Sequence, residues 1–418
     1  MAVNIAALPL ITDYPLAFRA CIVNSARHIL ARARQTGAVS TPNARSQALH
    51  TLSYALKLPE AWPDTRELLL TLAPKMEQAG FRDEWMPYLE QGIDQSQRLG
   101  DTAVEAELRL QLGTLYRLRG KYEQARIELE ASIRGFAALG DSLDQARALN
   151  ALAHVARLRR EFEKATSLVE AACSLLGERE TERGYSYLIL ALVAQDKRAW
   201  PEAADYCKRA LSLWTPEDDR RMIARTLTVL GAAYHRLEAY AEAIAVYEQA
   251  LTLFEDIQDV IYQAVARMNL GNVYLALGQA LPALERYRLA ERTFRQIQDQ
   301  HHLAMARHNI GMAYCQLEHW EQAERAYVSS LELKQEIGNV ASIANTMGEL
   351  GLVYLAQARR TDAKSILDAA LALSRAWRIS KMSLVMPICS RRLRPSSKKH
   401  PGQPEPAGAS PSHCFNSH

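Results

Sequence analysis

The stretch QAVARMNLGNVYLALGQALPALERYRLAERTFRQIQD, residues 263–299, contains the pattern that decides the fold. Leu270 and Tyr274 lie one helical turn apart within a run of apolar residues at helical spacing, which predicts a first helix with one apolar face. Leu-Gly-Gln at 277–279 then interrupts the run. Pro282 stands near the start of a second helix, where its missing N–H costs least. The stretch therefore predicts two helices joined by a short turn.

Small residues mark the place where these two helices cross. Gly271 in the first helix and Ala283 in the second leave room for two antiparallel helices to approach closely. Tyr287, Ala290 and Phe294 continue the apolar face of the second helix. We expect that face to be buried against the first helix.

The same unit returns along most of the chain. Its repeated apolar residue stands at Leu112, Leu152, Leu190, Leu230, Leu270, Ile310 and Leu350, at a spacing of 40 residues except for one step of 38. A fixed period of this length indicates one helical pair stacked on copies of itself. The sequence thus predicts an all-α superhelix of about seven to eight repeats. The signature positions of the repeat are Gly113, Tyr116, Ala125, Ala165, Ala203, Gly231, Tyr234, Ala243, Gly271, Tyr274, Ala283, Gly311, Tyr314, Ala323, Gly351, Tyr354 and Ala363.

The junctions between units also repeat. They are Gly100-Asp101, Gly140-Asp141, Gln258-Asp259, Gln298-Asp299 and Gly338-Asn339. Glycine suits the left-handed residue that ends a helix, and Asp or Asn suits the N-cap of the next one. We expect each junction to end a second helix and begin the following first helix.

These residues resemble the tetratricopeptide repeat. The small–aromatic–alanine–aromatic–alanine pattern of that family matches Gly271, Tyr274, Ala283, Tyr287 and Ala290, although the proline that ends many such repeats is missing from most units. The forty-residue spacing is similar to the long-helix variety found in Pins/LGN scaffolds, kinesin light chains and the solenoids of maltose-regulator-type bacterial activators. The resemblance covers residues 66–378 and implies a right-handed solenoid with a concave groove.

The two ends of the chain depart from this pattern. Residues 1–65 form a predicted helical leader, with helical patterns at 16–34 and 44–58 that could be one more degenerate pair. At Leu72 the repeat is recognisable, but Trp85 replaces the expected alanine, as in an atypical terminal unit. Residues 379–418 are basic and rich in Pro and Ser, so we expect them to be disordered. A shifted reading frame would explain that tail equally well.

Composition limits the classes of function. The formal net charge is +3, but the five Lys and Arg and one Glu after residue 390 leave a net −1 for the rest, so we expect no nucleic-acid partner. We find no secretory signal and no apolar run long enough to span a membrane. The cysteines have no paired spacing, which favours a reducing compartment, and we expect a cytoplasmic protein. They are Cys21, Cys173, Cys207, Cys315, Cys389 and Cys414.

The sequence contains none of the common catalytic motifs, and its histidines are the candidate metal ligands. No phosphate-binding loop, dinucleotide fingerprint, zinc-protease motif or nucleophile elbow is present. His301, His302 and His308 invite a metal interpretation, as do the tail residues His413 and Cys414. Ordinary polar surface is the simpler interpretation, because no Cys or carboxylate stands at ligand spacing. We therefore expect no enzymatic activity, no cofactor and no metal.

The groove of the solenoid is the candidate binding surface. The resemblance places groove-facing positions at offsets of −5, −2, +2 and +5 from each repeated apolar residue. An arginine-rich zone comes first, and a zone rich in Met and Asn follows. The alternative is that these arginines pair with nearby glutamates and the methionines pack between repeats. The candidates are Arg117, Arg147, Asn150, His154, Arg157, Arg225, His235, Asn269, Asn272, His308 and Asn309.

Two functions fit these residues. The first is a scaffold that binds a partner peptide, with Asn side chains on the peptide backbone and Arg forks on the carboxylates of an acidic segment. The second is a regulatory sensor module whose solenoid binds a small effector, as the resemblance to bacterial activators implies. The chain lacks the nucleotide-binding and helix-turn-helix parts of such activators, so its output would come from a partner.

Overall fold

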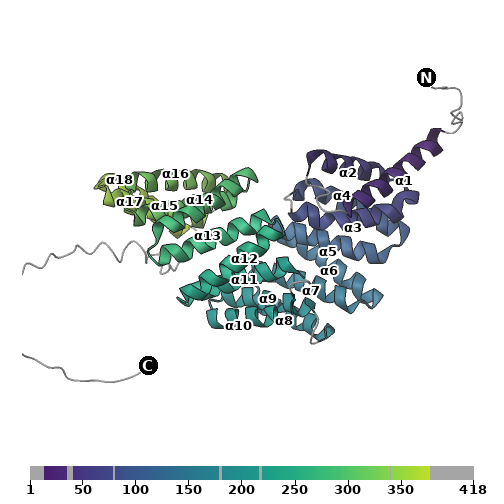
Figure 1. The fold of residues 1–418 in the computed structure, drawn as a ribbon, viewed down its shortest axis with the longest axis horizontal. Coiled ribbons are helices and arrows are strands. Elements are labelled where there is room, and N and C mark those ends of the chain that lie inside the picture. The colour runs from purple at the N-terminus through teal and green to yellow at the C-terminus, as the bar shows by residue number, and fades with distance from the viewer. Residues whose placement is uncertain are drawn as a thin grey trace, which may run out of the picture.

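The computed structural model describes residues 14–34, 41–78, 81–177, 181–215, 219–338 and 340–376. Every regular element in these residues is helical, and the pairs stack in chain order from α1 to α18 (Figure 1). The elements are α1 Tyr14–Ala33, α2 Pro42–Ala55, the 3₁₀ turn η1 Pro59–Ala61, α3 Trp62–Gln78, α4 Arg82–Leu99, α5 Thr102–Leu118, α6 Tyr122–Leu139, α7 Ser142–Leu158, α8 Phe162–Leu175, α9 Thr181–Asp196, α10 Trp200–Leu211, α11 Arg220–Arg236, α12 Tyr240–Asp256, α13 Val260–Ala276, α14 Ala280–Gln296, α15 Gln300–Gln316, α16 Trp320–Ile337, α17 Val340–Ala356 and α18 Arg360–Ala376.

Each repeat is an antiparallel pair made of a first and a second helix. The first helices are α5, α7, α9, α11, α13, α15 and α17, and each packs on the even-numbered helix that follows it. Successive first helices also contact one another, from α5 with α7 through to α15 with α17. Helices that approach each other at every step lie on the inside of the curve, so the first helices form the inner, concave surface. The expected all-α solenoid is confirmed.

The repeated glycine lets an aromatic ring of the second helix lie directly on the first helix. A Cβ added at Gly271 would come within 2.6 Å of the Tyr287 ring, and one added at Gly231 within 2.8 Å of Tyr247. Tyr287 is fully buried. The glycine therefore faces the second-helix aromatic sixteen residues later. Tyr274, one turn after Gly271 in the first helix, is only partly buried.

The junctions have the expected capping geometry. Gly100 and Gly140 end α4 and α6 in the left-handed conformation, with φ of 69° and 70°. Asp101 then caps α5, because its side chain accepts a hydrogen bond from the backbone N–H of Val104. Gln258 adopts a φ of 56° without being a glycine, and it is followed by the N-cap Asp259. Asn339 lies outside the described residues.

The N-terminal helices share a core with the first repeats. One apolar cluster runs from Ile29 in α1 through α3 and α4 to Leu115 in α5. Trp85, which stands where the repeat has alanine, is fully buried within that cluster. The N-terminal cluster thus accommodates an indole at the position where later repeats bury an alanine. The predicted tail, residues 379–418, lies outside the described residues, as do His413 and Cys414; no helix in the described part is long and apolar enough to cross a membrane.

Candidate binding surface on the inner helices

A cavity of about 390 Å³ opens on the inner side of the solenoid. Its walls come from α3, α5, α9 and α11 together with the segment before α11, so side chains from four separate helical pairs meet there. They are Glu77, Thr114, Arg117, Thr181, Glu182, Tyr185, Trp214, Asp219, Arg221, Met222 and Arg225. The curvature of the stack, rather than proximity in sequence, brings these residues together.

One ion pair crosses this cavity. Arg221 at the start of α11 donates from Nε to Asp259 Oδ2 at 2.8 Å, and a terminal nitrogen of the same side chain lies 3.5 Å from Glu77 Oε1 in α3. Asp259 is 3% exposed and also caps α13. Glu77 and Arg221 are 144 residues apart, so the contact links α3 near the start of the described chain to α11. The sequence offered no signal for it.

The predicted groove arginines fall into two groups. Arg147 pairs with Glu107 and Asp144, and Arg157, whose side chain is 12% exposed, pairs with Asp196 at 2.9 Å. Arg147 and Arg157 therefore fit the alternative interpretation, in which the groove arginines pair with nearby acidic residues. Their charge is largely neutralised by their neighbours.

Arg117 and Arg225 form the second group, and both line the cavity. Neither makes an ion pair with a carboxylate among the described residues. Arg225 lies over the Tyr262 ring, 5.0 Å from its centroid, and donates to Met222 Sδ at 3.5 Å. Burial by itself lowers the pKa of Arg225. The pKa is nevertheless raised overall by nearby groups, which are Tyr262, Tyr185, Glu77 and Asp259. Arg225 is therefore held by an aromatic ring and a thioether rather than by a carboxylate.

His154 lies buried close to these arginines. Its Nε2 is 3.2 Å from a terminal nitrogen of Arg157, and its Nδ1 has no hydrogen-bond partner within the described part of the chain. Burial, together with the charges of Arg117, Arg157 and Arg225, holds the pKa of His154 well below its usual range. The imidazole is therefore neutral, and it adds no charge to the cavity.

Asn150 is fully buried rather than facing the groove. Its amide donates to Glu182 Oε1 at 2.7 Å and accepts from the Ser186 hydroxyl at 3.0 Å, joining α7 to α9. Burial raises the pKa of Glu182 to about 7, with the charges of Asp144 and Asp219 adding to it and Asn150 and Arg147 opposing it. Asn150 stands two residues before the repeated apolar residue Leu152, and its side chain lies between successive first helices. Met268 occupies the same position before Leu270 and is only 3% exposed. Glu182, which the sequence did not single out, supplies the titratable carboxyl of the cavity.

The inner surface changes character from α13 onward. Tyr287 donates its hydroxyl to Asn272 Oδ1 at 2.7 Å, and the Asn309 amide donates to the same oxygen at 3.0 Å. Asn269 lies beside them and is partly exposed. His235, at the end of α11, is partly buried, and burial followed by the charge of Arg236 lowers its pKa. This region presents amides and apolar side chains instead of guanidinium groups.

His308 belongs to a buried cluster that joins α15, α16 and α17. Its Nδ1 lies 3.1 Å from Thr346 Oγ1, which also receives the Lys334 ammonium at 2.6 Å. Burial, with a smaller effect of Lys334, lowers the pKa of His308 to about 3, and burial lowers the pKa of Lys334 to about 8. His302 instead pairs with the N-cap Asp299. No group of metal-binding side chains occurs among the described residues.

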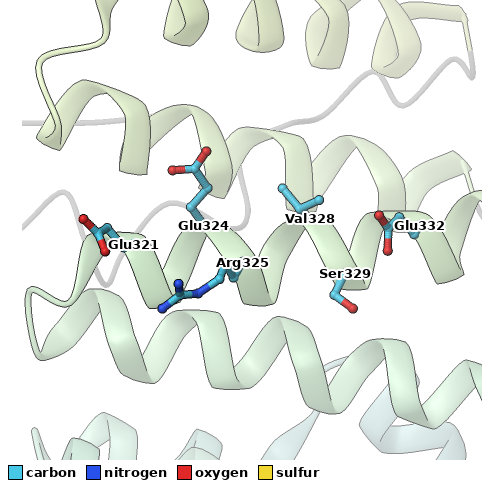
Figure 2. A pocket seen from close by; sticks show the side chains of 6 residues that line it. All are labelled: Glu321, Glu324, Arg325, Val328, Ser329 and Glu332. Atoms are coloured by element: carbon cyan, nitrogen blue, oxygen red, sulfur yellow. The ribbon is translucent and has the colours of Figure 1, made fainter.

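A second hollow, of about 440 Å³, lies along the single helix α16. Figure 2 shows its side chains spread along one face of that helix, including Glu321, Arg325 and Glu332. Glu324 there accepts from Arg359 at 2.9 Å. Because one helix supplies the whole lining, this hollow is a shallow surface feature, and the inner cavity is the better candidate site.

The comparisons with known proteins agree with this geometry. A family profile described as tetratricopeptide repeat matches residues 88–178, 182–256 and 262–336, which together make up more than half of the chain. No curated protein matches the sequence. All the structural similarities below are at low sequence identity, so they concern the fold alone.

Solved structures with the same fold include the following three. A Rap protein complexed with Competence and Sporulation Factor has 14% identity and a TM-score of 0.56, over 87% of this chain and 99% of that one. Aspartyl phosphate phosphatase F from Bacillus subtilis has 12% identity and a TM-score of 0.52, over 88% and 96%. A signal transduction ATPase from Pyrococcus horikoshii with a tetratricopeptide repeat sensor has 15% identity and a TM-score of 0.58, over 81% of this chain and 54% of that one. With its repeats, its inner surface and the profile match in agreement, this chain belongs to the tetratricopeptide repeat family.

Proposed function

We propose that this protein is a non-enzymatic interaction scaffold that binds a segment of a protein partner on its inner surface. The observation that carries the proposal is the cavity lined by α3, α5, α9 and α11, where two arginines lack a carboxylate partner among the described residues. A concave wall of this kind concentrates the field of its charges and favours an acidic segment. The Rap protein was solved with a bound factor on the same fold, which is consistent with such a role.

The two zones of the inner surface would divide the recognition. Arg117 and Arg225 would receive carboxylates through two-pronged hydrogen bonds. Asn269 and Asn309, farther along the solenoid, would hold the peptide backbone. The phosphatase activity in the name of the Bacillus subtilis neighbour is a statement about that protein, and at 12% identity it does not come to this chain.

A sensor module for a small effector is the second candidate. The volume of the cavity, about 390 Å³, suits a compact ligand as well as one or two residues of a peptide. In that case the effector would occupy the cavity alone, and the amide zone around Asn309 would not contribute to affinity. The effect of Asn309→Ala on binding therefore separates the two candidates.

Capture of partners by the purified protein, followed by mass spectrometry, tests the scaffold proposal. The bait is compared with an inner-surface variant, Arg117→Ala with Asn309→Ala, and with a matched control, Lys164→Ala, on the second helix α8. We expect the inner variant to lose the partner and the control to retain it, since the Lys164 side chain is 49% exposed and lies away from the cavity. Retention by the inner variant would contradict the proposal.

A further inference from the structure

Glu77 is the one cavity residue that reaches across from the first described repeats to the arginines of α11. Its carboxylate lies 3.5 Å from Arg221, and it helps to raise the pKa of Arg225, so it acts on two of the cationic groups. It comes from α3, whereas these arginines belong to a helix far along the chain. A carboxylate of the protein itself therefore stands where a carboxylate of a ligand would bind.

We propose that Glu77 is a resident anion of the cavity, which the carboxylate of a bound acidic peptide replaces at Arg221 while Arg117 and Arg225 hold the incoming group. The proposal rests on the proposed function and names the chemistry of its ligand. It follows from three observations. Arg221 pairs with Glu77, and it also pairs with Asp259. The other two arginines of the cavity have no carboxylate partner among the described residues.

The Glu77–Arg221 pair is the exchangeable one of the two. Arg221 has a closer partner in Asp259, at 2.8 Å against 3.5 Å, and Asp259 is almost fully buried. Removing Glu77 therefore leaves Arg221 paired, with no isolated buried charge. Glu77 itself is 24% exposed and becomes hydrated when it leaves. Because Arg221 keeps its closer partner Asp259, a ligand carboxylate can take the place of Glu77 at the longer contact.

The incoming carboxylate gains hydrogen bonds from Arg117 and Arg225, with which Glu77 forms no ion pair. Arg117 and Arg225 each carry planar guanidinium donors, and neither has a carboxylate within ion-pair distance among the described residues. Because both line the same cavity, each is a candidate donor to a carboxylate bound there. The chemistry points to the side chain of Asp or Glu, or to the terminal carboxylate of a peptide, because the group it replaces is itself a carboxylate.

Fluorescence anisotropy with a fluorescein-labelled hexaglutamate peptide tests the proposal, in one form with a free C-terminus and in one form amidated. We expect Arg117→Ala and Arg225→Ala each to weaken binding about tenfold. Glu77→Gln keeps the shape but removes the competing charge, and it should tighten binding about fivefold. Equal binding of the two peptide forms would assign the site to side-chain carboxylates, and preference for the free form would assign it to the terminal one.

Asp83→Asn is the matched control for Glu77→Gln. Asp83 also pairs with an arginine, the C-cap residue Arg119 of α5, but outside the cavity. Unchanged affinity in Asp83→Asn together with tighter binding in Glu77→Gln supports the proposal. Unchanged or weaker binding in Glu77→Gln, or the same gain in both variants, overturns it. If the peptide fails to bind while partner capture still depends on the inner surface, the resident-anion proposal is wrong and the proposed function stands.

Discussion

The arc from α5 to α11 and the arc from α13 to α17 are built by the same packing but present different chemistry. In both arcs a glycine of the first helix faces a large side chain of the second, as Gly113 faces Leu129 and Gly271 faces Tyr287. The inner side chains differ: guanidinium and carboxylate groups line the first arc, and amides follow in the second. The repeat therefore fixes the scaffold, while the positions that face inward remain free to vary.

The largest expected effect tests the shared packing. Ala243→Leu and Ala283→Leu should each destabilise the protein by about 1–3 kcal/mol, because these alanines are fully buried where the helices cross and extra methyl groups force them apart. Ala125→Leu should cost a similar amount in the first arc. Urea denaturation followed by circular dichroism measures all three. An unchanged midpoint in any of them would refute the common register of the two arcs.

The next effect separates the arcs by charge. Arg117→Ala should weaken an acidic partner about tenfold and make the dependence of affinity on salt shallower, because a charge-assisted contact is lost. Asn309→Ala in the second arc should weaken binding without changing that salt slope. Arg157→Ala and Arg157→Lys are informative comparisons, since Arg157 is already paired with Asp196 and both should bind nearly as the parent does. A steep loss for Arg157→Ala alone would move the site toward α7.

Glu182 should make the stability of the protein depend on pH. Its pKa of about 7 lies above the ordinary value of 4.5, so the folded state holds a proton that the unfolded chain releases. Its contribution to stability is therefore full below about pH 4.5 and is lost as the pH rises to about 7. Glu182→Gln should flatten the stability profile in this window, by on the order of 1 kcal/mol. Acidic peptide binding should also strengthen between pH 8 and 6, a change that Glu182→Gln removes.

His308 should contribute a dependence opposite to that of Glu182, in the same direction as the buried His154 of the first arc. Its pKa of about 3 lies below the ordinary 6.5, so the unfolded chain takes up a proton that the folded state refuses. Stability is therefore lost as the pH falls from about 6.5 toward 3, and His308→Gln should reduce that loss by on the order of 1 kcal/mol. Urea midpoints between pH 4 and 8 measure it. If His308→Gln flattens the dependence of stability on pH only above pH 7, the loss of stability in acid does not come from His308.

The fold could be predicted from the sequence because its information is local and repeated. Gly271, Ala283 and the Gly-Asp junctions specify a helix crossing and two caps within forty residues, and the stack repeats that unit. Trp85 marks the limit of this local information. The sequence identifies it as a departure from the repeat pattern, but the cluster that buries it depends on α3 and α4 together.

The candidate site could be predicted only in part. Arg117 and Arg225 were identified from their offsets, whereas Glu77 and Glu182 were not. The Glu77–Arg221 contact spans 144 residues and depends on the accumulated curvature of several repeats, which no single repeat encodes. Asn150 was assigned to the groove but is buried, because position −2 turns toward the neighbouring first helix. Whether an arginine is paired or open depends on such contacts.

Hydrogen–deuterium exchange of the protein with and without its captured partner tests the central claim most directly. If the inner surface binds the partner, protection should increase in the first helices that line the cavity, α5, α9 and α11, and extend to α13. The second helices α6, α8 and α12 on the outer side should exchange as before. Protection confined to those outer helices, with the inner ones unchanged, would contradict the account.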